Sequence, residues 1–417
     1  MKPDSILTIL IFEDKDLHMN KITPFIHLAL AAGILATAAH AKPANQEKLV
    51  KKYDFTKTAA FIESQITKGI IPGASLVVEH HGKTILRQNW GTYCSSNRRD
   101  TPVEDGVSNM LYSVSKGISA TVIVIAHEKG LIEYDAPLSK YIPEYKGKWK
   151  DTCTIRHLLT HSAGVPNCHL KSVYTPEQWK EAVTTLCNYE VEWEPGSRTA
   201  YHGLTGVFLA AEAVRRASGL PNWEAVCRKF LFDPIGAKSL TFMIPENTPI
   251  ALTPQPGTLP YAVNPDTYGL LGHPAGGCFG KVEDVLKVLR LNINEGVFNS
   301  KRLINKKEMQ EMHRVQYEKQ IAEAEAKGVA PTHEPWGLGW LIKRNLKDHW
   351  FGFGEKTSAR TFGHAGIDTV LTAAEPERDF ALVFLTTNSP KSPEGNTVLI
   401  RNTVTDLVTE AIDKAAK

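Results

Sequence analysis

Segments with the pattern of β-strands lie near both ends of this 417-residue chain, and helical patterns fill the stretch between them. Strands at both ends predict one sheet assembled from distant segments, with a helical insertion between the two halves of the sheet. Such an insertion would leave a cleft where it joins the sheet. We expect an α/β fold of the α+β kind, with a sheet subdomain at about 53–110 and 331–417 and a helical subdomain at about 111–330. The predicted strands are 74–78, 84–86, 339–343, 369–374 and 380–386, and the predicted helices are 53–69, 113–129, 154–161, 179–186, 204–217, 282–294 and 398–415.

The first 41 residues have the pattern of an export signal. From Met19, a short charged region precedes the apolar run 25–38, and Ala39-His40-Ala41 stands before Lys42. This order is typical of a secretory signal peptide, and the run is too short to span a membrane core of roughly 30 Å comfortably. We expect a leader at 1–41, with the start at Met19 and cleavage after Ala41, and a periplasmic or secreted mature domain at 42–417 with no stable membrane span.

Charge and cysteine usage exclude some functions. The net charge of +3 is not gathered in a basic block with interleaved aromatic residues, so we expect no nucleic-acid partner. Six cysteines permit disulfides in an exported chain, and Cys168 with Cys187, which bracket a loop-like stretch, is the favoured pair. No CxxC zinc spacing occurs, so we expect no metal, and no feature calls for a cofactor.

Ser113-Val114-Ser115-Lys116 is the strongest candidate for chemistry. Residues three apart share a helix face, so the Lys116 amine can lie against the Ser113 hydroxyl and act as its base. About one or two such tetrapeptides are expected by chance in a chain of this composition, so the context must decide. The expected helix begins at Ser113, where unpaired backbone N–H groups stabilise charge on a nearby oxygen, and ends at Gly130.

Two further segments supply that context. Tyr201 ends the turn 194–201, and a phenol near an ammonium group can shuttle protons between nucleophile and leaving group. Gly363-His364-Ala365-Gly366-Ile367 stands at the start of a predicted strand, where small residues let a substrate backbone approach and a backbone N–H can serve an oxyanion hole. His157 and His161 have the spacing of a metal pair but lack the glutamate of a zincin.

The chain resembles the serine β-lactamase and penicillin-binding protein family, closest to the class C β-lactamase and esterase branch. The resemblance covers about 53–415 and rests on five motifs in the family's order, at 112–116, 154–164, 194–201, 274–277 and 363–366. It implies a mainly antiparallel sheet flanked by N- and C-terminal helices, with an inserted helical subdomain. A Ser-x-x-Lys nucleophile is also the signature of the related class A enzymes.

The resemblance also implies roles for individual residues. Ser113 would be the nucleophile, Lys116 its base and Tyr201 a proton shuttle, and which of the last two is the principal base stays open. His364 stands where lactamases carry a lysine. The backbone N–H groups of Ser113 and Ile367 would form the oxyanion hole, and His202, Gly203, Ala365 and Gly366 would contact the substrate.

Two departures from the family pattern bear on the substrate. Gly203 replaces the asparagine of the Tyr-x-Asn motif, which in lactamases binds the acyl amide of the substrate, and the neutral imidazole of His364 gives up a charge-assisted bond to a β-lactam carboxylate. We therefore expect an exported serine hydrolase that forms an acyl-enzyme on Ser113 and cleaves carboxylic esters or small peptide or amide substrates. The alternatives are a class C-type β-lactamase or D-alanyl carboxypeptidase, and a penicillin- or cell-wall-ligand sensor without turnover. The oligomeric state stays open.

Overall fold

The computed structural model describes residues 52–95, 100–168, 172–251, 270–345, 351–367, 370–386 and 397–417. The predicted leader at 1–41 lies outside these residues. The helices are α2 Thr56–Thr67, α3 Val114–Glu128, α4 Ile155–Leu159, α5 Pro176–Asn188, α6 Thr205–Ser218, α7 Trp223–Cys227, α8 Val282–Ile293, α9 Lys306–His313, α10 Glu318–Ala326 and α11 Thr397–Ala415, with short turns of 3-10 helix at Leu138–Lys140 and π-helix at Arg228–Phe232. The strands are β1 Gly73–His80, β2 Lys83–Tyr93, β3 Thr101–Pro102, β4 Ser108–Met110, β5 Ile250–Ala251, β6 Phe279–Gly280, β7 Val297–Phe298, β8 Lys301–Arg302, β9 Leu341–Ile342, β10 Phe362–Ala365, β11 Leu371–Glu375 and β12 Phe380–Thr386.

The main sheet joins the two ends of the chain, as the sequence predicts. Its seven strands have the order β3-β2-β1-β12-β11-β10-β9, and neighbouring strands are antiparallel. The central pairing is between β1 and β12, with Ala74 opposite Thr386 and His80 opposite Phe380. This pairing confirms the expected antiparallel sheet of the α/β fold.

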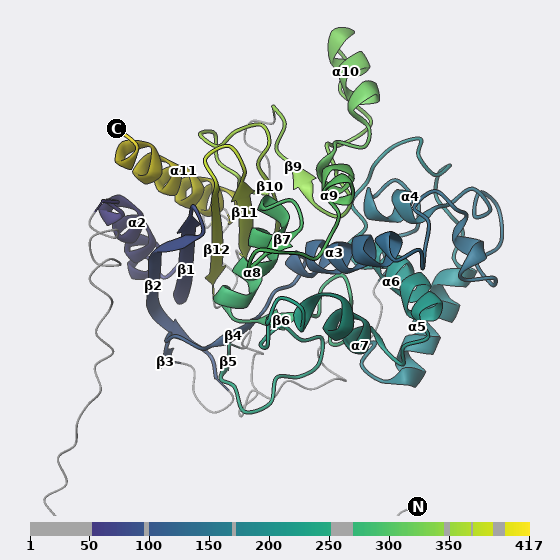
Figure 1. The fold of residues 1–417 in the computed structure, drawn as a ribbon, viewed down its shortest axis with the longest axis horizontal. Helices are drawn as coiled ribbons and strands as arrows, with labels where there is room; N and C mark the ends of the chain where they lie inside the picture. The colour runs from purple at the N-terminus through teal and green to yellow at the C-terminus, as the bar shows by residue number, and fades with distance from the viewer. Residues whose placement is uncertain are drawn as a thin grey trace, which may run out of the picture. The chain divides into compact units, whose positions relative to one another are not determined.

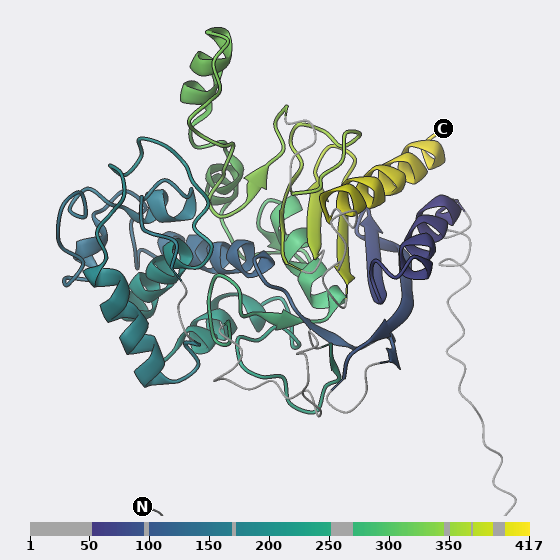
Figure 2. The ribbon, with the colours of Figure 1, turned by 180° about the vertical axis from the view of Figure 1, so that it is seen from behind.

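Both faces of this sheet are covered by helices, which explains why the β12 sequence is almost continuously apolar. Helices α2 and α11, from opposite ends of the chain, lie side by side on one face (Figures 1 and 2). There Leu76 and Leu382 join a buried cluster with Ile62 of α2 and Val404 of α11. Residues one position along each strand, such as Val77, point the other way and belong to the core around α3 and α8.

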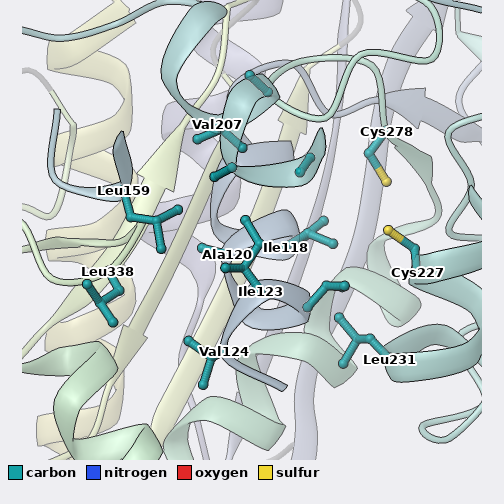
Figure 3. Close-up of a cluster of buried hydrophobic side chains, with 14 of the residues drawn as sticks. Ile118, Ala120, Ile123, Val124, Leu159, Val207, Cys227, Leu231, Cys278 and Leu338 are labelled. Carbon is teal, nitrogen blue, oxygen red and sulfur yellow. The ribbon is translucent and has the colours of Figure 1, made fainter. Parts of the chain in front are cut away.

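Helix α3 runs through the middle of the helical region and carries the predicted nucleophile at its start. Every residue from Val114 to Ala126 is buried, so the helix has no exposed face over that length. Figure 3 shows the side chains that surround it, including Leu159 and Val207 from α4 and α6. Gly130 follows with a φ of 71°, which confirms the expected left-handed end of this helix.

One strand differs from the sequence prediction. The segment around His364 forms a strand of its own, β10, whereas it was expected to begin the next strand; Gly366 and Ile367 make the turn into β11. The charged run 306–327 forms two helices, α9 and α10, separated by a break. Within the described ranges, no helix is both long and apolar enough to cross a membrane.

The expected disulfide is wrong, because both of its cysteines are free thiols. All six cysteines are free. Cys187 lies on the buried face of α5, and Cys168 hydrogen-bonds the side chain of Tyr189 on the chain just beyond that helix.

Candidate active site

Ser113 stands at the N-terminus of α3, with Lys116 one turn further along the same face. Lys116 Nζ lies 3.0 Å from Ser113 Oγ and 2.9 Å from the carbonyl oxygen of Ala275. The ammonium group is fully buried and, among the described residues, hydrogen-bonds only uncharged oxygen atoms. This burial lowers its pKa to about 7. About half of the amine is therefore neutral near pH 7 and able to accept a proton.

The turn at 274–277 holds that carbonyl in place. His273 Nδ1 accepts a hydrogen bond from the Ala275 backbone N–H at 3.0 Å, and the His273 carbonyl accepts bonds from Gly276 and Gly277. Ser119 on α3 donates to the Pro274 carbonyl oxygen at 2.7 Å. The fourth sequence motif is thus a tight turn that is bonded to α3 twice, through Lys116 and Ser119.

Tyr201 lies against both members of the pair. Lys116 Nζ is 5.0 Å from the centroid of its ring, and the phenol is hydrogen-bonded to Ser113. Burial raises the pKa of Tyr201, and the hydrogen bond with Ser113 opposes that rise only in part. The phenol therefore stays protonated near neutral pH and can donate a proton.

Backbone bonds to the end of α4 fix the position of Tyr201. The Ala200 N–H donates to the His161 carbonyl at 2.9 Å, and the His202 N–H donates to His161 Nδ1 at 3.1 Å. The His161 ring packs on Tyr201 with centroids 4.7 Å apart, and Trp336 contacts both rings, edge-on to His161 and stacked with Tyr201. No sequence motif pointed to Trp336, which lies in an irregular segment before β9.

His157 and His161, which have the spacing of a metal pair, make separate contacts. His157 accepts a hydrogen bond from the Thr154 N–H and belongs to the capping box of α4, whereas His161 faces Tyr201. The part of the chain that the structure describes contains no group of three or more His, Cys, Asp or Glu residues that could hold a metal ion.

His364 is an uncharged imidazole at the centre of β10. Its Nδ1 lies 2.6 Å from the carbonyl oxygen of Ala365, which can only accept, so Nδ1 carries the proton. Burial and the nearby Lys116 amine hold the pKa of His364 well below its usual range. Its Nε2 is buried without a hydrogen-bond partner among the described residues, and the ring lies 6.1 Å from that of Tyr201.

The segment after His364 lies beside the start of α3. A Cβ atom at Gly366 would stand 2.9 Å from the Leu111 carbonyl oxygen, so glycine permits this close approach. Arg401 of α11 donates a hydrogen bond to the Gly366 carbonyl oxygen. Because the two groups of a peptide bond point in opposite directions, this contact turns the Ile367 N–H away from α11. In the described ranges, the backbone N–H groups of Ser113 and Ile367 donate to no protein group.

Among the expected substrate contacts, Gly366 lies beside the residues before α3, Gly203 is two residues after Tyr201, and His202 is buried. The His202 ring is 2 % exposed and packs against His161 and Trp193. Ala365 is also buried, as the last residue of β10. The structure therefore brings Ser113, Lys116, Tyr201 and His364 into one place, while the contacts of His202 and Ala365 with a substrate stay predictions.

Comparison with known proteins decides the family. The family model described as Beta-lactamase matches residues 58–405. The chain belongs to the beta-lactamase family. It is a serine hydrolase of that family, in agreement with the sequence prediction.

Individual relatives are distant but similar over most of their length. A Salmonella agona protein named "Putative D-alanyl-D-alanine carboxypeptidase" is 24 % identical over 379 residues, which are 81 % of this chain and 83 % of that protein. The solved structure of EstCE1, titled a hydrolase with promiscuous acyltransferase activity, has a TM-score of 0.67 at 17 % identity. The match covers 88 % of this chain and 100 % of the EstCE1 chain. A penicillin-binding protein homologue from Caulobacter crescentus has a TM-score of 0.64 at 19 % identity, covering 83 % and 95 % of the two chains. These structures confirm the β-lactamase-like fold.

Proposed function

We propose that this family member hydrolyses carboxylic esters or small amides through an acyl-enzyme on Ser113, with Lys116 as the principal base. The contact of 3.0 Å between Lys116 Nζ and Ser113 Oγ, with a lysine pKa of about 7, carries the proposal. Tyr201 is the weaker candidate for the base, since burial raises its pKa and keeps the phenol protonated.

The steps follow from these positions. Ser113 Oγ attacks the carbonyl carbon of the substrate and its proton passes to Lys116 Nζ. The Ser113 and Ile367 N–H groups stabilise the negative oxygen of the tetrahedral intermediate. Tyr201 gives its proton to the leaving group and regains one from Lys116. Water then attacks the carbonyl carbon of the acyl-enzyme, with the same proton transfers in the reverse direction. The carboxylic acid is released and Ser113 regains its proton.

The preference for esters or small amides rests on the groups that are missing. His364 is neutral, so it offers a β-lactam carboxylate no charge-assisted bond, and Gly203 has no side chain to bind the acyl amide. Both losses weaken binding in the transition state of β-lactam cleavage more than they affect proton transfer.

Covalent labelling tests the nucleophile. A fluorophosphonate should add one adduct to the intact mass of the protein, and Ser113→Ala should abolish it. Ser115→Ala is the matched control, because Ser115 Oγ accepts a bond from the Cys278 N–H and lies away from the proton pathway; this variant should still be labelled. Labelling that persists in Ser113→Ala would refute the assignment.

D-alanyl carboxypeptidase activity is the second candidate, supported by the name of the Salmonella relative. Turnover of nitrocefin and of D-alanyl-D-alanine peptides should be compared with turnover of short-chain nitrophenyl esters. Nitrocefin or peptide rates equal to the ester rates would reverse our preference. A penicillin adduct that persists for hours without product would instead favour a sensor.

Export to the periplasm or the medium belongs to the same proposal. The charged, apolar and small-residue order at 19–41 supports it. Sequencing of the N-terminus of protein from cell fractions should find Lys42 first in an exported fraction, and an intact N-terminus in the cytoplasm would contradict it.

A further inference from the structure

A cavity lies in the helical region, where α5 and α7 both pack against α6 (Figure 1). Its volume is about 520 Å³, which is within the range of sites for small molecules. None of the four catalytic candidates is among the described residues that line it. Tyr201 precedes α6, whereas Arg215 lies in the cavity wall near the end of that helix, and ten residues of helix span roughly 15 Å. The cavity is therefore separate from the candidate active site.

The wall of this cavity is mainly apolar and rich in aromatic rings. Its apolar members include Val173, Trp179, Val183, Trp223, Phe242 and Met243. Thr184 and Met243 line the cavity and are exposed, so the cavity is open to solvent. Apolar surface in a concave site favours a ligand with an apolar body, because binding removes both surfaces from water.

The charged side chains in the wall cancel one another. The described lining residues include three acidic and three basic ones, namely Glu144, Glu212, Glu224, Lys180, Arg215 and Arg216. Glu212 is buried, pairs with both arginines and accepts a bond of 2.8 Å from Trp179 Nε1. The other two carboxylates are likewise paired with arginines. A wall without net charge gives no advantage to a charged ligand, which would have to lose its hydration on binding.

One polar group in the wall is left without a partner. The Trp223 side chain is 1 % exposed, and its Nε1 has no hydrogen-bond partner among the described residues. An indole N–H can only donate, and a buried donor that is left unpaired is unfavourable. Trp179 Nε1, in the same wall, is already bonded to Glu212. An acceptor atom on a ligand would satisfy Trp223.

We propose that this cavity binds a small, uncharged aromatic molecule that carries an acceptor oxygen, such as an aryl ketone. Its ring lies among the aromatic side chains of the wall, and its oxygen accepts a hydrogen bond from Trp223 Nε1. Because Ser113 does not line the cavity, the molecule is bound there without being cleaved. The inference goes beyond the proposed function and does not depend on it.

The test uses two probes of the same shape, 2-acetonaphthone and 2-isopropenylnaphthalene, in which a CH₂ group replaces the ketone oxygen. Equilibrium dialysis should find one saturable site for each probe on the wild type. In Trp223→Phe, the ratio of the two Kd values should shift about fivefold against the ketone, the usual effect of one hydrogen bond between uncharged groups. Trp90→Phe is the matched control, because Trp90 is also a buried indole with an unpartnered Nε1 but lies on β2; it should keep the wild-type ratio.

A second variant fills the cavity from its exposed side. Thr184→Trp on α5 should weaken the binding of both probes at least tenfold, whereas Asn188→Trp, at an exposed position of the same helix outside the cavity wall, should leave it unchanged. Circular dichroism shows whether each variant is folded. Absence of saturable binding to the wild type, or unchanged binding to folded Thr184→Trp, would overturn the site. An unchanged Kd ratio in Trp223→Phe would overturn the role of the indole and the need for an acceptor oxygen.

Protein labelled on Ser113 by a fluorophosphonate separates the cavity from the active site. The labelled protein should bind both probes as the unlabelled protein does, because the adduct lies outside the cavity. Loss of probe binding on labelling would place the probes in the active site and overturn the inference. Failure of Ser113 to be labelled would refute the proposed function alone, since the cavity variants test this site without it.

Discussion

Replacing Lys116 by methionine, which has similar length and no charge, should stabilise the protein while abolishing activity. Among the described residues the buried amine hydrogen-bonds only the hydroxyl of Ser113 and the carbonyl of Ala275, and burial lowers its pKa from 10.5 to about 7. That difference corresponds to an unfavourable free energy of about 5 kcal/mol for the ammonium form in the folded state. The two lost hydrogen bonds offset this gain by about 1 kcal/mol each.

The pH dependence has a definite sign. Below pH 7 the amine is protonated in both states, so the folded wild type carries the full cost of burying the charge. Between about pH 7 and pH 10.5 the unfolded chain binds more protons than the folded one, so the stability of the wild type rises with pH. The advantage of Lys116→Met in free energy of unfolding should therefore shrink by about 2 kcal/mol between pH 7 and pH 9.

Urea unfolding followed by tryptophan fluorescence at pH 6, 7, 8 and 9 measures this difference. Lys129→Met, at the exposed end of the same helix, is the matched control and should differ from wild type by a constant amount. The kcat/KM for acylation should rise with a midpoint near pH 7 as the amine loses its proton. A constant gap between wild type and Lys116→Met from pH 7 to pH 9 would show that the lysine stays charged, and the argument for it as base would fail.

Three further predictions concern the neighbourhood of that pair. Tyr201→Phe should lower kcat by about 10²- to 10⁴-fold, the usual contribution of a positioned proton donor, and a loss under tenfold in steady-state kinetics would remove it from the proton pathway. Arg401→Met should lower kcat about tenfold with little change in KM, because the Ile367 N–H loses its fixed direction. Arg401→Lys should recover part of the loss, and a changed KM with constant kcat would contradict this prediction. In the native protein a thiol reagent should modify Cys168 first, because the other five cysteines are buried. Peptide mass mapping reads the labelled positions, and labelling of a buried thiol at the same rate as Cys168 would contradict this prediction.

The sequence predicted the parts of the site that depend on local spacing. Ser113 and Lys116 are one helical turn apart, so their contact follows once the helix begins at Ser113, and the glycine at 130 marked the other end of that helix. The sheet could be predicted because both faces of β1 and β12 are buried, which requires apolar runs at the two ends of the chain.

Contacts between distant segments could not be read in this way. Nothing in the sequence near Gly203 indicates that Asn167 fills its space, since the two are brought together by the loop after α4. Trp336 and Arg401 likewise act on Tyr201 and Gly366 from segments without a motif. The expected disulfide between Cys168 and Cys187 was wrong, because their spacing along the chain does not determine where the buried side chain of Cys187 points.

The pairing of β1 with β12 also governs how this enzyme gains its activity after synthesis. Val77 and Val383 are partners although most of the chain lies between them, and contacts of such long sequence separation form slowly because a large loop must close. Strand β10, which carries His364, is held to β1 only through β11 and β12. In refolding, α3 and its neighbouring helices can form from local contacts, so the helical signal should recover before hydrolysis does, and activity reports the moment at which the first and last strands meet.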